Sequence, residues 1–148
     1  MLFRSRLLTN AEWQVAALGT PDPGIDNGTS FCRISGGGTG LTGSRNECIS
    51  DVGAMDMVGN IWEWVADWWP AEYEEDGNGC STGWSGFSDD YNCGAVSPSN
   101  AGPSALLRGG DAITSGGGRA AGVFAIAATV PPQAEVSNIG FRCARDLW

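Results

Sequence analysis

The C-terminal run from residue 106 to residue 145 constrains the fold most, because short strand-like segments alternate there with irregular ones. Residues 139–145 alternate apolar and polar side chains, as a half-buried strand does. Residues 121–126 predict a second short strand. No helix or strand period organises the small, chemically mixed residues around that strand. Irregular segments framed by strands usually form surface loops, and binding residues concentrate on such loops.

Composition predicts one domain over residues 1–148 that binds neither nucleic acid nor membranes. The chain is 42% hydrophobic and has seven Trp, which is typical of a globular protein with a core. Its net charge is −9, and all eight basic residues are Arg, whereas phosphate binding needs clustered cations. No stretch approaches the roughly 20 apolar residues of a membrane span. The first residues lack the apolar core of a secretory signal.

The five cysteines favour disulfides over a metal site. There is no CxxC pair and no His, which argues against zinc. Cys32 and Cys48 bracket a Gly-rich loop, as do Cys80 and Cys93, so each pair is a candidate local disulfide. The alternative is that all five are free thiols. We expect Cys143, in the terminal strand, to be unpaired and buried as a small apolar residue.

Local signals place one helix near the start. Thr9 and Glu12 have the spacing of a capping box, which predicts a helix that continues to Leu18 and ends at Gly19. Residues 31–34 suggest a short strand.

Residues 56–69 predict the central strand. Alternation puts Trp62, Trp64 and Trp68 on one face and Glu63 on the other. We expect the aromatic face to be buried, since each such ring covers on the order of 150–250 Å². Glu63 is unusual on a central strand, and the residues alone indicate a solvated or capped carboxylate.

A long insertion of about residues 70–104 follows, rich in Gly, Ser, Asp and Asn. Loops of this length are usually functional or disordered. Trp84, Phe87 and Tyr91 suggest that the insertion packs on the body of the domain.

Four motifs in order resemble the formylglycine-generating enzyme (sulfatase-modifying factor) family, at residues 6–13, 56–64, 108–110 and 139–145. The resemblance implies an α+β, loop-rich domain with a C-type-lectin-like fold. Residues 121–125 and the small residues around them are most similar to one branch, the variable proteins of diversity-generating retroelements. Those proteins display a hypervariable ligand-binding surface on this fold. The family domain is longer, so we expect a minimal version or a part of a longer protein.

The resemblance also indicates that the parent activity is absent. The parent enzymes use two catalytic Cys five residues apart, the first of them six residues past the Arg of the Arg-Gly-Gly motif. Thr114 and Arg119 occupy those places here. Without His, no Ser-His or Cys-His pair can form. We therefore expect no enzyme, with a carboxylate-only hydrolase using Asp56, Glu63 and Asp67 as the alternative.

The variable-protein resemblance implies ten ligand-binding positions in a variable region of about residues 106–145. These are Asp111, Ala112, Ile113, Thr114, Arg119, Ala127, Thr129, Val130, Ala134 and Val136. Retroelement diversification replaces template adenines, and all ten residue types can be reached from the Asn codons AAC and AAT. Gln133 and Glu135, which lie between predicted sites, cannot. The alternative is an ordinary loop whose small residues belong to the reachable set by chance.

We expect this site to be separate from the scaffold. The eight positions from Ile113 onward in that set should lie together in solvent. The framework should be buried, and we assign to it Trp62, Trp64, Phe124, Ile139 and Phe141.

The resemblance further implies calcium, held by the carbonyls of Val58, Gly59 and Ile61 and the carboxylate of Glu63. Oxygen ligands suit this hard cation. No other cofactor is expected. The expected partner is a protein or cell-surface ligand. We expect the chain itself to lie on a phage virion, or on a cell surface where another component displays it. The alternatives are an inactive or residual formylglycine-generating-type enzyme and a phage or cell-surface structural domain without variability.

Overall fold

The computed structural model describes residues 5–22, 31–35, 37–69, 80–81, 84, 86–93, 103–113 and 117–145. Within them the chain forms helix α1 (Asn10–Ala16), the 3-10 helix η2 (Gly117–Ala120) and eight short strands. The strands are β1 (Arg6–Leu7), β2 (Trp62–Trp69), β3 (Cys80–Ser81), β4 (Asn92–Cys93), β5 (Ser104–Arg108), β6 (Ile126–Ala127), β7 (Ile139–Phe141) and β8 (Cys143–Ala144). Most of the predicted insertion, and Thr114, lie outside the described residues.

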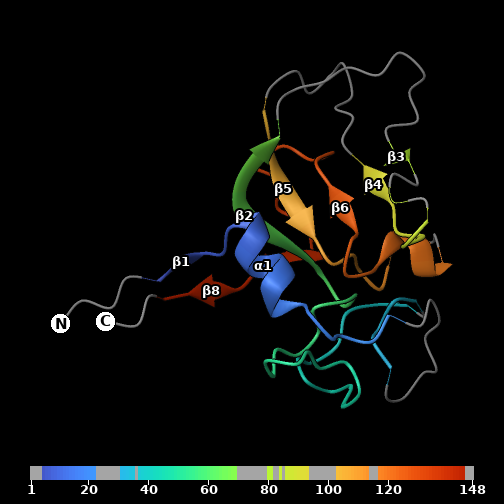
Figure 1. Ribbon diagram of the computed structural model, residues 1–148. Helices are drawn as coiled ribbons and strands as arrows, with labels where there is room; N and C mark the ends of the chain where they lie inside the picture. The colour runs from blue at the N-terminus through green and yellow to red at the C-terminus, as the bar shows by residue number, and fades with distance from the viewer. Residues whose placement is uncertain are drawn as a thin grey trace.

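The strands form a six-stranded sheet and a separate two-stranded ribbon. The sheet has the order β3-β4-β6-β5-β2-β7, and β1 pairs with β8 (Figure 1). The central pair, β2 and β5, is antiparallel, whereas β7 runs parallel to β2. Helix α1 packs against β2 and β5, and the ribbon of β1 and β8 extends away from the body (Figure 1). This mixed, strand-rich fold with long irregular segments agrees with the expected loop-rich α+β class.

Helix α1 begins where the sequence predicts and ends earlier. The Thr9 side chain accepts a hydrogen bond from the Glu12 amide, and the Glu12 carboxylate accepts one from the Thr9 amide, which completes the capping box. The helix ends at Ala16 rather than at Leu18, because the amides of Leu18 and Thr20 bond three residues back in tighter turns. Gly19 follows with φ +77°, in the left-handed region that favours glycine.

The face of β2 that carries the aromatic side chains is not the buried one, so that prediction is wrong. Glu63 and Val65 are buried, Trp62 and Trp64 are half-buried, and Trp68 is 58% exposed. The reason is the position of the main core cluster, which fills the space between the sheet and α1. Its buried members are Leu8, Trp13, Ala17, Met57, Val65, Leu106, Ile126 and Ala128.

Three other strand predictions need correction. Residues 31–34 form no strand, and the Arg33 carbonyl instead accepts from the Asn60 amide at 2.7 Å. Of the second predicted strand, residues 121–126, only Ile126 pairs in the sheet, together with Ala127 on β6, because residues 121–124 form a turn. The terminal strand splits into β7 and β8 at Arg142, whose guanidinium reaches the carboxylate of Glu63.

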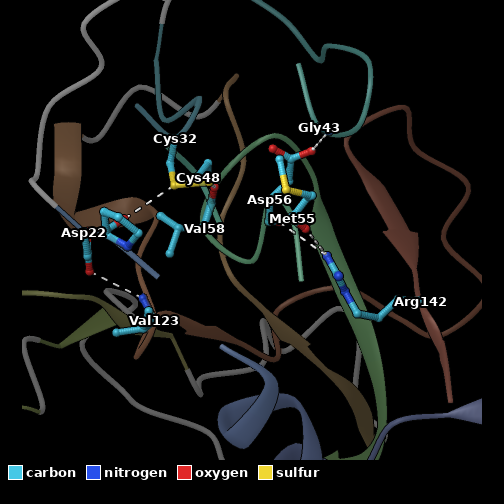
Figure 2. Close-up of a disulfide and its surroundings, with 10 residues drawn as sticks. Asp22, Cys32, Gly43, Cys48, Met55, Asp56, Val58, Val123 and Arg142 are labelled. Carbon is cyan, nitrogen blue, oxygen red and sulfur yellow. Dashed lines mark hydrogen bonds between the residues drawn. A yellow bond between two sulfur atoms is a disulfide. The ribbon is translucent and has the colours of Figure 1, made fainter. Parts of the chain in front are cut away.

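Both candidate disulfides form, and the fifth cysteine differs from expectation. Cys32 and Cys48 are bonded, buried and packed among apolar side chains (Figure 2). Cys80 and Cys93 are bonded across the pair of β3 and β4. Cys143 is free, as expected, but it is exposed rather than buried. It lies on β8, in the ribbon that extends from the body of the domain (Figure 1), although its neighbour Ala144 packs against the main core.

Candidate functional site

The Arg-Gly-Gly motif holds the middle of the predicted variable region in place. Arg108 ends β5 and is 1% exposed. Its guanidinium donates hydrogen bonds to the carbonyls of Val123 and Ala125, both at 3.1 Å, and to the side chain of Gln14. It also lies 4.8 Å from the centre of the Trp13 ring, and burial lowers its pKa to about 10. One buried cation therefore fixes the turn formed by residues 123–125.

The two glycines of the motif are required by close backbone approach. Gly109 and Gly110 have φ of +89° and +81°. A Cβ on Gly110 would lie 2.2 Å from the Cα of Ala121, a contact that no side chain permits. The Gly109 carbonyl accepts from the amides of Gly59 and Gly122, at 2.9 and 3.2 Å. The motif thus joins β5 directly to the start of β2 and to the 121–124 turn.

Asp90 holds the same turn through a backbone amide, and sequence reasoning missed it. Its side chain is fully buried and accepts from the Phe124 amide at 2.8 Å. A Cβ on Gly122 would lie 2.0 Å from its Oδ1, so the carboxylate rests directly against the glycine backbone. Burial raises its pKa above the ordinary 3.8. In the sequence, Ser-Asp-Asp at 88–90 looks like any solvated acidic turn, so no signal there marks the residue.

The structure describes nine of the ten predicted variable positions, all but Thr114, and they differ in exposure. Exposed positions are Ile113, Arg119, Thr129 and Val136, and half-buried ones are Val130 and Ala134. Buried positions are Asp111, Ala112 and Ala127, at 0%, 2% and 6%. The expectation that Ala127 lies in solvent is therefore wrong, because it pairs within the sheet on β6. Asp111 is held inside by the amide of Ile113 and the side chain of Asn138.

Several of these positions meet around the outer face of the sheet. Ala127 and Val130 belong to a cluster with Leu107, Cys93 and partly buried aromatic residues. One of those is Tyr91, whose amide donates to the Arg119 carbonyl at 2.8 Å. Arg119 also forms an exposed ion pair with Asp89, at 3.7 Å.

A second set of hydrogen bonds ties Asp111 and Val136 to the edge of the sheet. Asn138 bonds the Asp111 carboxylate with its side chain and accepts from the Trp62 amide through its carbonyl. The Val136 carbonyl in turn accepts from the Ile139 amide at 3.3 Å. Hydrogen bonds thus fix Asp111 and the turn at residues 136–139 to the start of β2 and to β7.

The framework prediction holds only in part. Trp62, Trp64, Phe124 and Ile139 are half-buried. Phe141 is 63% exposed, so its placement in the buried framework is wrong. It lies on β7, the edge strand of the sheet, where no further described strand covers it.

Comparison with known proteins identifies the family. The pattern of the sulfatase-modifying factor enzyme 1-like domain matches residues 3–147. The chain belongs to this family. A formylglycine-generating enzyme from Thermomonospora curvata is 31% identical over 87 residues, which cover 46% of this chain and 29% of that enzyme. The match thus spans less than a third of that enzyme's length. No solved structure matches.

The calcium site implied by the family resemblance does not fit the arrangement of Glu63. Its carboxylate already accepts three hydrogen bonds, from Trp13 Nε1 at 2.8 Å and from Arg142 Nε and Nη2 at 2.6 and 2.5 Å. A guanidinium supplies the countercharge that a cation would bring. Among the described residues, no group of three or more His, Cys, Asp or Glu could hold a metal. Val58 and Gly59, two of the expected carbonyl ligands, are buried, and the third, Ile61, is half-buried.

Arg142 thereby explains why a carboxylate occupies a central strand. Besides the two bonds to Glu63, its Nη2 donates to the Met55 carbonyl at 3.1 Å (Figure 2). Nearby, the Asp56 carboxylate accepts from the Gly43 amide at 2.7 Å (Figure 2). Asp67 accepts from the Asn10 amide at 2.6 Å, ahead of α1. Each of the three carboxylates, Asp56, Glu63 and Asp67, accepts hydrogen bonds from a different partner. They therefore form no common carboxylate site.

Proposed function

We propose that this member of the sulfatase-modifying factor family is a ligand-binding protein rather than an enzyme. More specifically, it is a variable protein of a diversity-generating retroelement that presents loop residues on a C-type-lectin-like scaffold. Its ligand is a protein or a cell-surface molecule. The observation that carries the proposal is the way in which the turn at residues 123–125 is held by two buried side chains outside it.

This arrangement separates backbone geometry from side-chain identity. Arg108 donates hydrogen bonds to carbonyls of the turn, and Asp90 accepts a hydrogen bond from one of its amides. Neither residue is among the ten variable positions. Exposed residues on either side, such as Arg119 and Thr129, can therefore change without removing the contacts that hold the loop. A diversified binding surface needs that independence, because many side chains must be carried on one backbone.

The proposed contact residues are the exposed and half-buried members of the predicted set. Ile113, Thr129, Val130 and Val136 give an apolar, short-chained surface, and Arg119 adds a charge at its border. Such a surface suits an apolar or aromatic spot on a protein partner. The buried Asp111, Ala112 and Ala127 would shape the surface from beneath rather than contact the partner.

The test is the DNA around the gene. We expect a nearby reverse transcriptase gene and a near-repeat of the 3′ end that differs only at template adenines. The differences should fall on the codons of the exposed positions. A genomic neighbourhood with neither feature contradicts the retroelement proposal.

A second candidate function is the oxidation of a substrate cysteine, favoured by the likeness to a formylglycine-generating enzyme. The residues argue against it: Thr114 and Arg119 stand at the two catalytic Cys positions, and the one free thiol described, Cys143, lies apart on β8. The two candidates are separated by incubating the chain with copper and a cysteine-containing peptide. We expect no aldehyde product.

A further inference from the structure

The two disulfides differ in how accessible they are to a reductant. Cys32 and Cys48 are 1% and 0% exposed and belong to an apolar core cluster. In the other bond Cys80 is exposed, and its partner Cys93 is buried. Thiol–disulfide exchange requires an attacking thiolate to reach one of the two sulfurs, so access decides which bond breaks first. The Cys80–Cys93 bond is therefore open to a reductant, and the other bond is covered.

The accessible bond lies at the edge of the main sheet. Among the described strands, β3 is the outermost and pairs with β4 alone, on the far side of the sheet from the ribbon of β1 and β8 (Figure 1). The pairing consists of Cys80 opposite Cys93 and Ser81 opposite Asn92. Because β3 has only two residues, its own backbone contacts are few, and the disulfide supplies the covalent link that keeps it against β4.

Strand β4, on the inner side of the bond, holds the backbone of β6. The Tyr91 carbonyl accepts a hydrogen bond from the Ile126 amide at 3.0 Å. The Cys93 carbonyl accepts one from the Ala128 amide at 2.8 Å. One partner of the disulfide thus bonds directly to the segment between the predicted variable positions Ala127 and Thr129.

The residues just before β4 reach the same region. The Asp90 carboxylate accepts from the Phe124 amide at 2.8 Å, and the Tyr91 amide donates to the Arg119 carbonyl at 2.8 Å. Asp89 forms the exposed ion pair with Arg119. Residues 89–91 lie within the loop that the disulfide closes, over a sequence separation of 13. A cross-link of this kind limits the conformations that the loop can reach when it opens.

We propose that the Cys80–Cys93 disulfide is a redox switch for the backbone of residues 124–128. A dithiol reductant attacks the exposed sulfur of Cys80, and Cys93 leaves as a thiolate. The second thiol of the reductant then releases Cys80, so the protein gains two electrons, two protons and two thiols while the reductant becomes a disulfide. Reduction frees β3, and residues 124–128 then open more often. The effect on ligand binding rests on the proposed function, whereas the switch itself does not.

The first experiment titrates the native, oxidised chain with dithiothreitol and maps alkylated thiols by peptide mass spectrometry. It uses Cys143→Ser, so that every thiol that appears comes from a disulfide. We expect Cys80 and Cys93 to be reduced at a dithiothreitol concentration at least about tenfold below the one that reduces Cys32 and Cys48. Reduction of both bonds together, or of the buried bond first, would overturn the proposal.

The second experiment measures amide hydrogen exchange by NMR in the chain reduced at the edge disulfide alone. The reporter amides are those of Phe124, Ile126 and Ala128, which bond to residues 90–93. They should exchange at least about tenfold faster than in the oxidised chain, and glutathione disulfide should restore the slow rate. The amide of Ala17, at the end of α1, is the internal control and should not change.

The matched variant combines Cys80→Ser with Cys93→Ser and should show the fast exchange without any reductant. Unchanged exchange at the reporter amides contradicts the switch. An equal rise at Ala17 also contradicts it, because the whole domain would then be opening. If the double variant does not fold, the selectively reduced chain decides the question, since both of its cysteines are intact. No ligand is used, so failure of the switch and failure of the proposed function are told apart.

Discussion

Replacing Glu63 with Gln tests the buried ion pair between Glu63 and Arg142. The carboxylate side chain is 8% exposed and Arg142 is 24% exposed, with a shortest N–O distance of 2.5 Å. Removing one partner of a buried pair typically costs about 3–5 kcal/mol, because the other charge stays buried and unpaired. That is a large part of the roughly 5–15 kcal/mol that stabilises a domain. In a chain of this size it corresponds to a fall in melting temperature of about 6–20 °C.

The assay is urea unfolding of Glu63→Gln, Arg142→Met and the double variant, with disulfides intact. The double variant should lose less than the sum of the single variants, by about 1–3 kcal/mol, because the two residues act on each other. The matched control is Glu12→Gln, which weakens the exposed Arg6–Glu12 pair and should cost far less. Calcium and excess chelator should leave the wild-type curve unchanged. Additive single effects, or a curve that chelator shifts, would refute the ion-pair account.

Three further predictions concern residues that hold the loops in place. Asp90→Asn should raise stability at neutral pH: burial raises the pKa of Asp90, so its contribution is present at low pH and lost as pH rises through that raised pKa. Wild-type stability should therefore fall with rising pH more than that of the variant, and parallel pH profiles would contradict this. Gly110→Ala should lower the free energy of unfolding by more than about 2 kcal/mol, since the new Cβ adds a clash to backbone strain. The control Gly53→Ala, with nothing within 4 Å of its Cβ, should lower it by about 1–2 kcal/mol through strain alone. Equal melting temperatures of the two variants would argue against the close approach at Gly110. Removing the Cys32–Cys48 disulfide, which closes a separation of 16 residues, should cost about 3 kcal/mol in denaturant unfolding, and a loss well below 1 kcal/mol would mean that the bond adds little.

Local signals in the sequence predicted local structure well. The capping box at Thr9 needs only a hydroxyl and a carboxylate three residues apart, and it forms. The Gly-rich loops bracketed by cysteines also close, since each pair is near in sequence. Both glycines of the Arg-Gly-Gly motif have positive φ, a backbone conformation that favours glycine.

What the sequence could not predict depends on contacts between distant segments. The alternation in β2 defines two faces, but only the position of α1 decides that Val65 rather than Trp68 faces the core. Arg142 lies 79 residues from Glu63, so nothing near the strand marked its countercharge. Asp90 is separated from Phe124 by 34 residues in an otherwise ordinary polar turn. The burial of Asp111 likewise depends on Asn138, 27 residues away.

The central claim is that the loop backbone does not depend on the side chains it carries, and one variant tests it most directly. It combines Ile113→Tyr, Arg119→Ser, Thr129→Asn and Val136→Tyr, all at exposed positions and all within the set that Asn codons can reach. Exposed substitutions usually change stability by within about 0.5 kcal/mol each, so the free energy of unfolding should change by no more than about 2 kcal/mol. Urea unfolding of the variant beside the wild type measures this difference. A stable, cooperatively folding variant is the predicted result, and a loss above about 4 kcal/mol, or a chain that no longer folds, would contradict the account.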